Sequence, residues 1–170
     1  MNLKAFLYLS FLMPIFSSCQ TEKKLSEYPR FIGDIAFDSK YDKSNFYLCN
    51  EKDIAQYHND SKGMEYKGEK IALQEEIFSK FKAMIDTSQN GLIRIRFIVN
   101  CKGETDRFRI ISMDENYNEK KFSINITEQL LLICKELKGW LPKKLDGKEV
   151  DYYQYLIFKI NRGNLIEILP

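Results

Sequence analysis

Two runs of alternating residues, joined by a short polar turn, constrain the fold of this chain most. The first run covers residues 92–99 and the second covers residues 107–113. Alternation with a period of two is typical of a strand with one buried face. Gly103 in the turn supplies the positive φ that a short hairpin loop requires. The pattern therefore predicts an antiparallel β-hairpin.

Two helices and a third strand complete the regular elements that periodicity predicts. Apolar residues recur at helical spacing over residues 69–84 and again over residues 126–138. Asn125 is the expected N-cap of the second helix, and Gly139 should end it. A longer strand is expected over residues 150–160. This order predicts an α+β domain in which two helices cover one face of a three-stranded antiparallel sheet.

The first eighteen residues have the composition of a cleaved export signal peptide. Lys4 gives a positive start, an apolar run covers residues 5–16, and two serines precede Cys19. The apolar run has about a dozen residues, fewer than the roughly 20 that a membrane-spanning helix needs. We therefore expect residues 1–18 to be a signal peptide. A plain secretory signal with an incidental cysteine is the alternative to a lipoprotein signal.

The residues around the expected cleavage point, Phe16-Ser17-Ser18-Cys19, resemble the lipobox of bacterial lipoproteins. This resemblance implies diacylation of the Cys19 thiol, and the acyl chains would hold the protein on a membrane. The expected location is the cell envelope, at the outer membrane, facing the periplasm or the cell surface. Residues 19–27 are expected to form a tether, residues 28–65 an irregular extension, and residues 66–170 the α+β domain.

Short motifs in the expected domain resemble the C-terminal domain of TonB, the energy transducer of the cell envelope. They span roughly the last hundred residues. They are Tyr66-Lys67-Gly68-Glu69, the strand at 91–100 with Gly103, Trp140-Leu141-Pro142, and Asp146-Gly147-Lys148-Glu149-Val150 before a strand containing Phe158.

The resemblance implies a protein-interaction module that receives a peptide strand at its last strand. In the strand expected at 150–160, the candidate binding residues are Tyr153, Tyr155 and Ile157. The chain departs from the family because a lipidated Cys19 replaces the membrane helix and only four prolines occur. The resemblance thus predicts the fold more directly than energy transduction.

A second candidate surface follows from strand alternation. If the helices cover the apolar face, the opposite face combines basic and aromatic side chains. One interpretation is a solvated face with cross-strand Arg and Tyr contacts. The other is a platform for an anionic or sugar-containing envelope ligand. The residues are Arg94, Arg96, Arg107, Arg109, Tyr153 and Tyr155.

Export would place the remaining cysteines in an oxidising compartment, where thiols tend to pair. Cys49 in the extension and Cys101 in the hairpin turn are the candidate disulfide. Cys134 lies in the apolar stripe of the second helix and is expected to be a buried free thiol. Two reduced, unrelated thiols are the alternative to the disulfide.

The sequence contains few residues in arrangements that are typical of a catalytic site. His58 is the only histidine, and a pair of Cys49 and His58 would lack an orienting third group. Neither metal-ligand spacing nor a Gly-rich phosphate loop is found, and a formal charge of +2 indicates no nucleic-acid partner. We expect a non-catalytic protein without metal or cofactor that binds an envelope protein. Its oligomeric state is not indicated.

The lipid anchor makes the first testable prediction. Replacing Cys19→Ser removes the thiol that would be acylated, so the variant should be soluble or uncleaved. Mass spectrometry of the detergent fraction should then find no processed, acylated species. A processed and acylated Cys19→Ser protein would contradict the lipoprotein interpretation.

Overall fold

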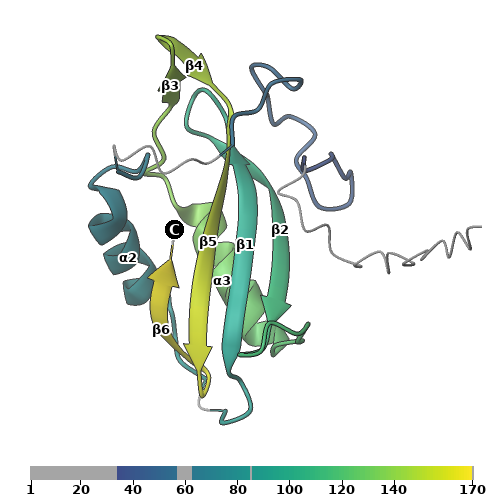
Figure 1. Ribbon diagram of the computed structural model, residues 1–170, viewed down its shortest axis with the longest axis vertical. Helices are drawn as coiled ribbons and strands as arrows, with labels where there is room; N and C mark the ends of the chain where they lie inside the picture. Colours follow the sequence, from purple (N-terminus) through teal and green to yellow (C-terminus); the bar gives the residue numbers. More distant parts are fainter. Residues whose placement is uncertain (1–33, 57–62, 85, 170) are drawn as a thin grey trace, which may run out of the picture. The chain divides into compact units, whose positions relative to one another are not determined.

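The computed structural model describes residues 34–56, 63–84 and 86–169 of the chain (Figure 1). The expected signal peptide, Cys19, the tether and His58 lie outside the described residues. The described part begins at Asp34 and belongs to one compact unit that extends to the C-terminal end of the domain.

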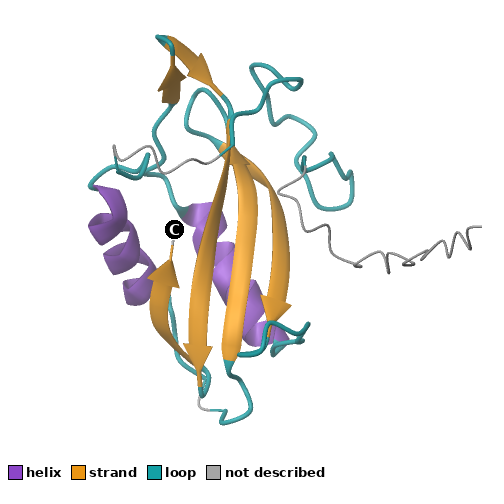
Figure 2. Ribbon diagram, viewed as in Figure 1, coloured by secondary structure: helices purple, strands orange, loops and turns teal. Residues whose placement is uncertain are grey.

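The described residues form an α+β domain, as the sequence predicts. Its main sheet is antiparallel and has the strand order β2-β1-β5-β6, and a separate small ribbon pairs β3 with β4 (Figure 2). The elements are α2 (Glu69–Lys80), β1 (Gly91–Val99), β2 (Thr105–Met113), α3 (Ile124–Glu136), β3 (Lys143–Leu145), β4 (Lys148–Val150), β5 (Tyr152–Asn161) and β6 (Asn164–Leu169).

The prediction of three strands is wrong, because the main sheet has a fourth strand, β6. The chain reverses after β5 through Arg162 and Gly163, whose φ angles are 51° and 76°. Positive φ at both central residues defines the type I′ turn, which matches the twist of paired strands. The last residues therefore return along β5, where Asn161 pairs with Asn164 and Ile157 pairs with Leu169.

Both helices differ from their predicted bounds. Helix α2 ends at Lys80 because Phe81 is already extended, with φ −73° and ψ 129°. The chain after it turns toward the β5–β6 turn, where the Met84 amide donates to the Gly163 carbonyl over 3.1 Å. Helix α3 begins at Ile124, so Ser123 rather than Asn125 is its N-cap residue.

One large apolar core lies between the sheet and the two helices. Its fully buried members include Ile93 and Ile95 of β1, Leu73 and Ile77 of α2, and Leu130 of α3. Both helices therefore cover the same face of the sheet, as predicted. The regular spacing of these residues follows from the two periodicities of strand and helix.

One corner of this core depends on close contact between Tyr66 and Gly139. Tyr66 lies edge-on to Trp140, with ring centroids 5.0 Å apart, and its hydroxyl donates to Glu76 over 2.6 Å. Burial and the neighbouring Glu76 raise the pKa of the Tyr66 phenol. A methyl group on Gly139 would overlap the Tyr66 ring. The absence of a side chain at residue 139 is thus a packing requirement.

This contact predicts that Gly139→Ala lowers the free energy of unfolding by about 1–3 kcal/mol, as overpacking typically does. Gly139 has no positive φ, so steric overlap is the expected cause. Denaturant unfolding checks the value. Gly147→Asn is the control, because open space surrounds a Cβ at that position and Asn tolerates its left-handed φ. Equal stability of the Gly139→Ala variant and the wild type would contradict the prediction.

Candidate functional site

The sheet face opposite the helices is partly covered by the extension that precedes the domain. Ile35 of the extension forms a buried cluster with Ile98 of β1 and Tyr153 of β5. Three further apolar residues of the extension, Phe46, Leu48 and Ile54, pack against this cluster. The sheet face that alternation predicts to be open is therefore covered by the extension around Ile98 and Tyr153.

Two of the predicted platform arginines bind the extension itself. Arg109 donates to both carboxylate oxygens of Asp42 over 2.7 Å, and the Asp42 side chain is completely buried. Arg107 donates to the Ile35 carbonyl over 3.2 Å and to Glu51 over 2.8 Å. The hydrogen bonds from Arg109 hold the pKa of Asp42 below its ordinary value. These guanidinium groups are thus engaged within the chain.

The other two arginines stack on tyrosines of the neighbouring strand. The guanidinium of Arg94 lies 4.5 Å from the ring centre of Tyr155, and that of Arg96 lies 4.4 Å from the ring centre of Tyr153. Burial lowers the pKa of Arg96 from its ordinary value. The six predicted residues do share one face, and the contacts seen there match the cross-strand Arg and Tyr interpretation.

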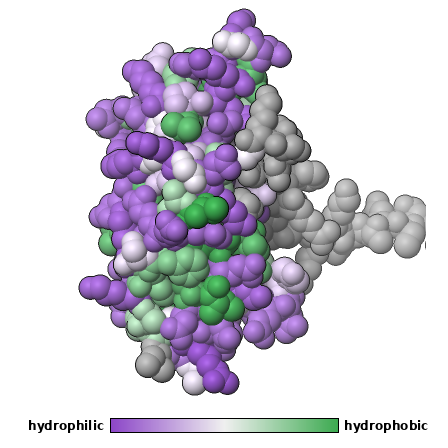
Figure 3. Space-filling model, turned by 90° about the vertical axis from the view of Figure 1, so that its left-hand side faces the viewer, coloured by the Kyte–Doolittle hydropathy of each residue, from purple (hydrophilic) through white to green (hydrophobic). Residues whose placement is uncertain are grey.

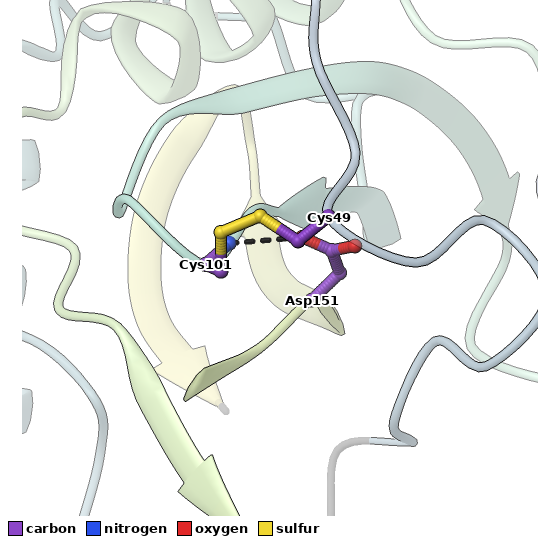
Figure 4. A group of neighbouring side chains, drawn as sticks. All are labelled: Cys49, Cys101 and Asp151. Atoms are coloured by element: carbon purple, nitrogen blue, oxygen red, sulfur yellow. Dashed lines mark hydrogen bonds between the residues drawn. A yellow bond between two sulfur atoms is a disulfide. The ribbon is translucent and has the colours of Figure 1, made fainter. Parts of the chain in front are cut away.

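The candidate disulfide is present in the structure: Cys49 is bonded to Cys101 (Figure 4). Cys134 is a buried free thiol, as expected, and burial raises its pKa. The bond joins the extension to the turn between β1 and β2. Closing a loop with a sequence separation of 52 stabilises the fold by about 4 kcal/mol in the chain-entropy model.

Asp151 lies beside the disulfide and was not singled out by the sequence. Its carboxylate is completely buried and accepts a hydrogen bond from the Asn50 amide at 2.8 Å. It also accepts one from the Cys101 amide at 2.9 Å (Figure 4). Within the described part of the chain, Cys49, Cys101 and Asp151 are the group whose ligand atoms are close enough for a shared metal ion. Both sulfur atoms already form the disulfide, so the arrangement is structural.

The strand expected to receive a partner strand lies inside the sheet. β5 pairs with β1 along its length and with β6 from Ile157 to Asn161. At its other end, the Tyr153 amide donates to the Ala55 carbonyl of the extension over 2.9 Å. The expectation of an accessible edge at Ile157 is therefore wrong, because the unpredicted strand β6 covers it.

The main sheet ends at β2 on one side and at β6 on the other. Part of the outer side of β2 is covered, since the Lys120 amide donates to the Ser112 carbonyl over 3.1 Å. The side of β6 that faces away from β5, here named the β6 edge, has no strand partner among the described residues. Its Ile168 carbonyl accepts a hydrogen bond from the Gln74 side chain of α2 over 2.9 Å.

Apolar side chains are exposed on the elements that flank the β6 edge. Ile71 and Phe78 lie three residues before and four residues after Gln74 on α2, and are 71% and 43% exposed. Ile166 of β6 is 47% exposed. Figure 3 shows an apolar patch on the side of the domain that carries α2 and β6. Ile71 and Phe78 belong to the helical spacing that predicts a helix over residues 69–84, and this spacing gave no sign that the two side chains are exposed.

No protein-family model, curated protein or solved structure matches the chain. The structure by itself defines the class as an α+β domain with an antiparallel sheet that ends at β6. None of the helices in the described ranges is both long and apolar enough to cross a membrane.

The Asp42–Arg109 pair predicts a pH dependence of stability. Because the pKa of Asp42 is lowered in the folded state, the ionised carboxylate contributes to the free energy of unfolding. This contribution is complete above pH 3.8, the ordinary pKa, and is lost as the pH falls through the lowered pKa. Asp42→Asn should lower the free energy of unfolding at neutral pH by about 2 kcal/mol, the scale of hydrogen bonds to charged groups. Denaturant unfolding at several pH values checks this. The difference from wild type should shrink in acid, and a difference that grows in acid would contradict it.

Proposed function

We propose that this chain is a non-catalytic, lipid-anchored protein of the bacterial cell envelope whose domain binds a protein partner by strand addition at the β6 edge. The observation that carries the proposal is the unpaired β6 edge beside the exposed side chains of Ile71, Phe78 and Ile166. An added strand would form backbone hydrogen bonds and would cover these apolar groups.

The β6 edge lacks several devices that usually keep sheet edges from pairing. Edges are often blunted by proline, by inward-pointing charge, or by a covering loop. β6 contains no proline between Asn164 and Leu169, and the side chains that flank it include apolar groups. Among the described residues, the Gln74 side-chain amide donates to the Ile168 carbonyl on the β6 edge. A backbone amide of a partner strand can take the place of this donor, so the carbonyl keeps a hydrogen bond. Exposed apolar surface of this kind marks interaction sites.

The place of the protein in the envelope rests on its sequence. The lipobox-like residues before Cys19 support lipid anchoring, and the Cys49–Cys101 disulfide is consistent with an oxidising compartment. The motifs similar to the TonB C-terminal domain support strand addition at the last strand, which in this chain is β6. The Arg and Tyr platform is the weaker candidate, because Arg107 and Arg109 already bind the extension.

The test uses two substitutions of Ile168. The Ile168 carbonyl faces away from β5, toward Gln74, and the amide of the same strand residue points to the same side. Ile168→Pro removes this amide but breaks no pairing with β5, since proline is tolerated where the amide faces away from the sheet. Ile168→Ala loses a similar buried side chain but keeps the amide, so it is the matched control. Both variants should lose about 2–4 kcal/mol of stability, which thermal unfolding will verify.

Partner binding is measured by a photo-crosslinking residue at Ile166 in cells that express the chain. Capture of a partner should be lost in Ile168→Pro and retained in Ile168→Ala. A crosslinker at Leu132 on α3, which is 59% exposed and therefore more accessible than Ile166, should capture no such partner. If folded Ile168→Pro captures the partner as well as Ile168→Ala does, strand addition at β6 is wrong.

A further inference from the structure

A hollow of about 300 Å³ lies next to β6. Its apolar lining includes Leu92 of β1 with Ile166 and Leu169 of β6. Its charged groups are Glu115, Glu167 and Lys159, so carboxylates outnumber ammonium groups there. A recess with apolar walls and an excess of negative charge fits a long basic side chain, because Lys and Arg bury an aliphatic stem while their charged head stays near the surface.

The carboxylates of the hollow are available to a partner. Lys159 lies 3.6 Å from Glu167, but their side chains are 50% and 48% exposed. Exposed pairs of this kind contribute little, so Glu167 can accept a second cation. Glu115 forms no ion pair within the described ranges. A basic group entering the hollow would therefore meet two carboxylates and would displace only a weak contact.

Strand geometry places a partner side chain at this hollow. Side chains of a strand paired with β6 alternate between the two faces of the sheet. Residues on the face of Glu167 would lie beside the hollow, and their neighbours in sequence would lie on the face covered by α2. On that second face the exposed groups of the helix are Ile71 and Phe78. The two faces of an added strand therefore meet different chemistry.

We infer that the partner segment alternates apolar residues with a basic residue, whose side chain enters the hollow beside Glu167 and Glu115. This inference rests on the proposed strand addition and specifies which segment is accepted. A segment with an acidic residue at the same position would place like charges side by side. Cross-strand charge pairs have modest energies whose sign depends on the charges, so the two segments should differ about tenfold in affinity.

The experiment uses the full chain purified in detergent and two short synthetic peptides of alternating valine and threonine. The peptides differ at one central position, which is lysine in one and glutamate in the other. Binding is followed by NMR shifts of the β6 amides. The lysine peptide should bind about tenfold more tightly at low salt, and the preference should shrink as salt is added.

Charge substitutions identify the carboxylate that sets the preference. Glu167→Lys should abolish or reverse the preference for the lysine peptide. Glu75→Lys is the matched control, because Glu75 is exposed on α2 but does not line the hollow, and it should leave the preference in place. A preference that survives Glu167→Lys would overturn the assignment of the hollow.

The remaining outcomes separate this inference from the proposed function. Equal affinity for the two peptides, with binding lost in Ile168→Pro, would overturn the basic partner and would leave strand addition supported. Absence of binding by both peptides would overturn strand addition and the basic partner together.

Discussion

The antiparallel pairing of β1 with β5 is the interaction on which the rest of the domain depends. It runs from Gly91 and Ile160 at one end to Val99 and Tyr152 at the other. This central pair gives the helices an apolar face and gives the extension a second face at Ile98 and Tyr153. It also makes β5 an inner strand once β6 folds back, so the surface available for pairing moves to the last strand.

Charge has a structural use on the face opposite the helices. Arg109 and Arg107 hold the extension through Asp42 and Glu51, and the buried carboxylate of Asp106 accepts the Lys43 amide over 2.8 Å. Asp151 binds two amides in the same manner beside the disulfide. Asp106 and Asp151 accept amides of irregular segments that lack a ladder of their own, and Asp42 of the extension accepts the guanidinium of Arg109 in β2. The extension is therefore part of the fold, although its sequence has neither the helical nor the alternating apolar period that would predict this.

Local patterns predicted the parts of the structure that depend on near neighbours. Alternation located β1 and β2, helical spacing located α2 and α3, and cysteine placement identified the disulfide. β6 was missed because the turn at Arg162 and Gly163 was not recognised, although residues 164–169 are strongly apolar. The open face was misjudged for a different reason. Alternation correctly put Arg107 and Arg109 on one face, but what covers that face depends on Asp42, which is 67 positions from Arg109.

The disulfide also sets the route by which force would pass through the molecule. Tension applied to the chain from its N-terminal side reaches Cys49 and crosses the covalent bond to Cys101, next to the end of β1. The part of the extension before Cys49 can detach from the sheet one contact at a time. The residues between Cys49 and Cys101 carry no tension, because the disulfide transmits it directly. If a partner pulls on β6 at the same time, the load is shared across the β1–β5 and β5–β6 hydrogen bonds. Under such opposed tension, force would pass from Cys49 to β6 through one covalent bond and the paired central strands.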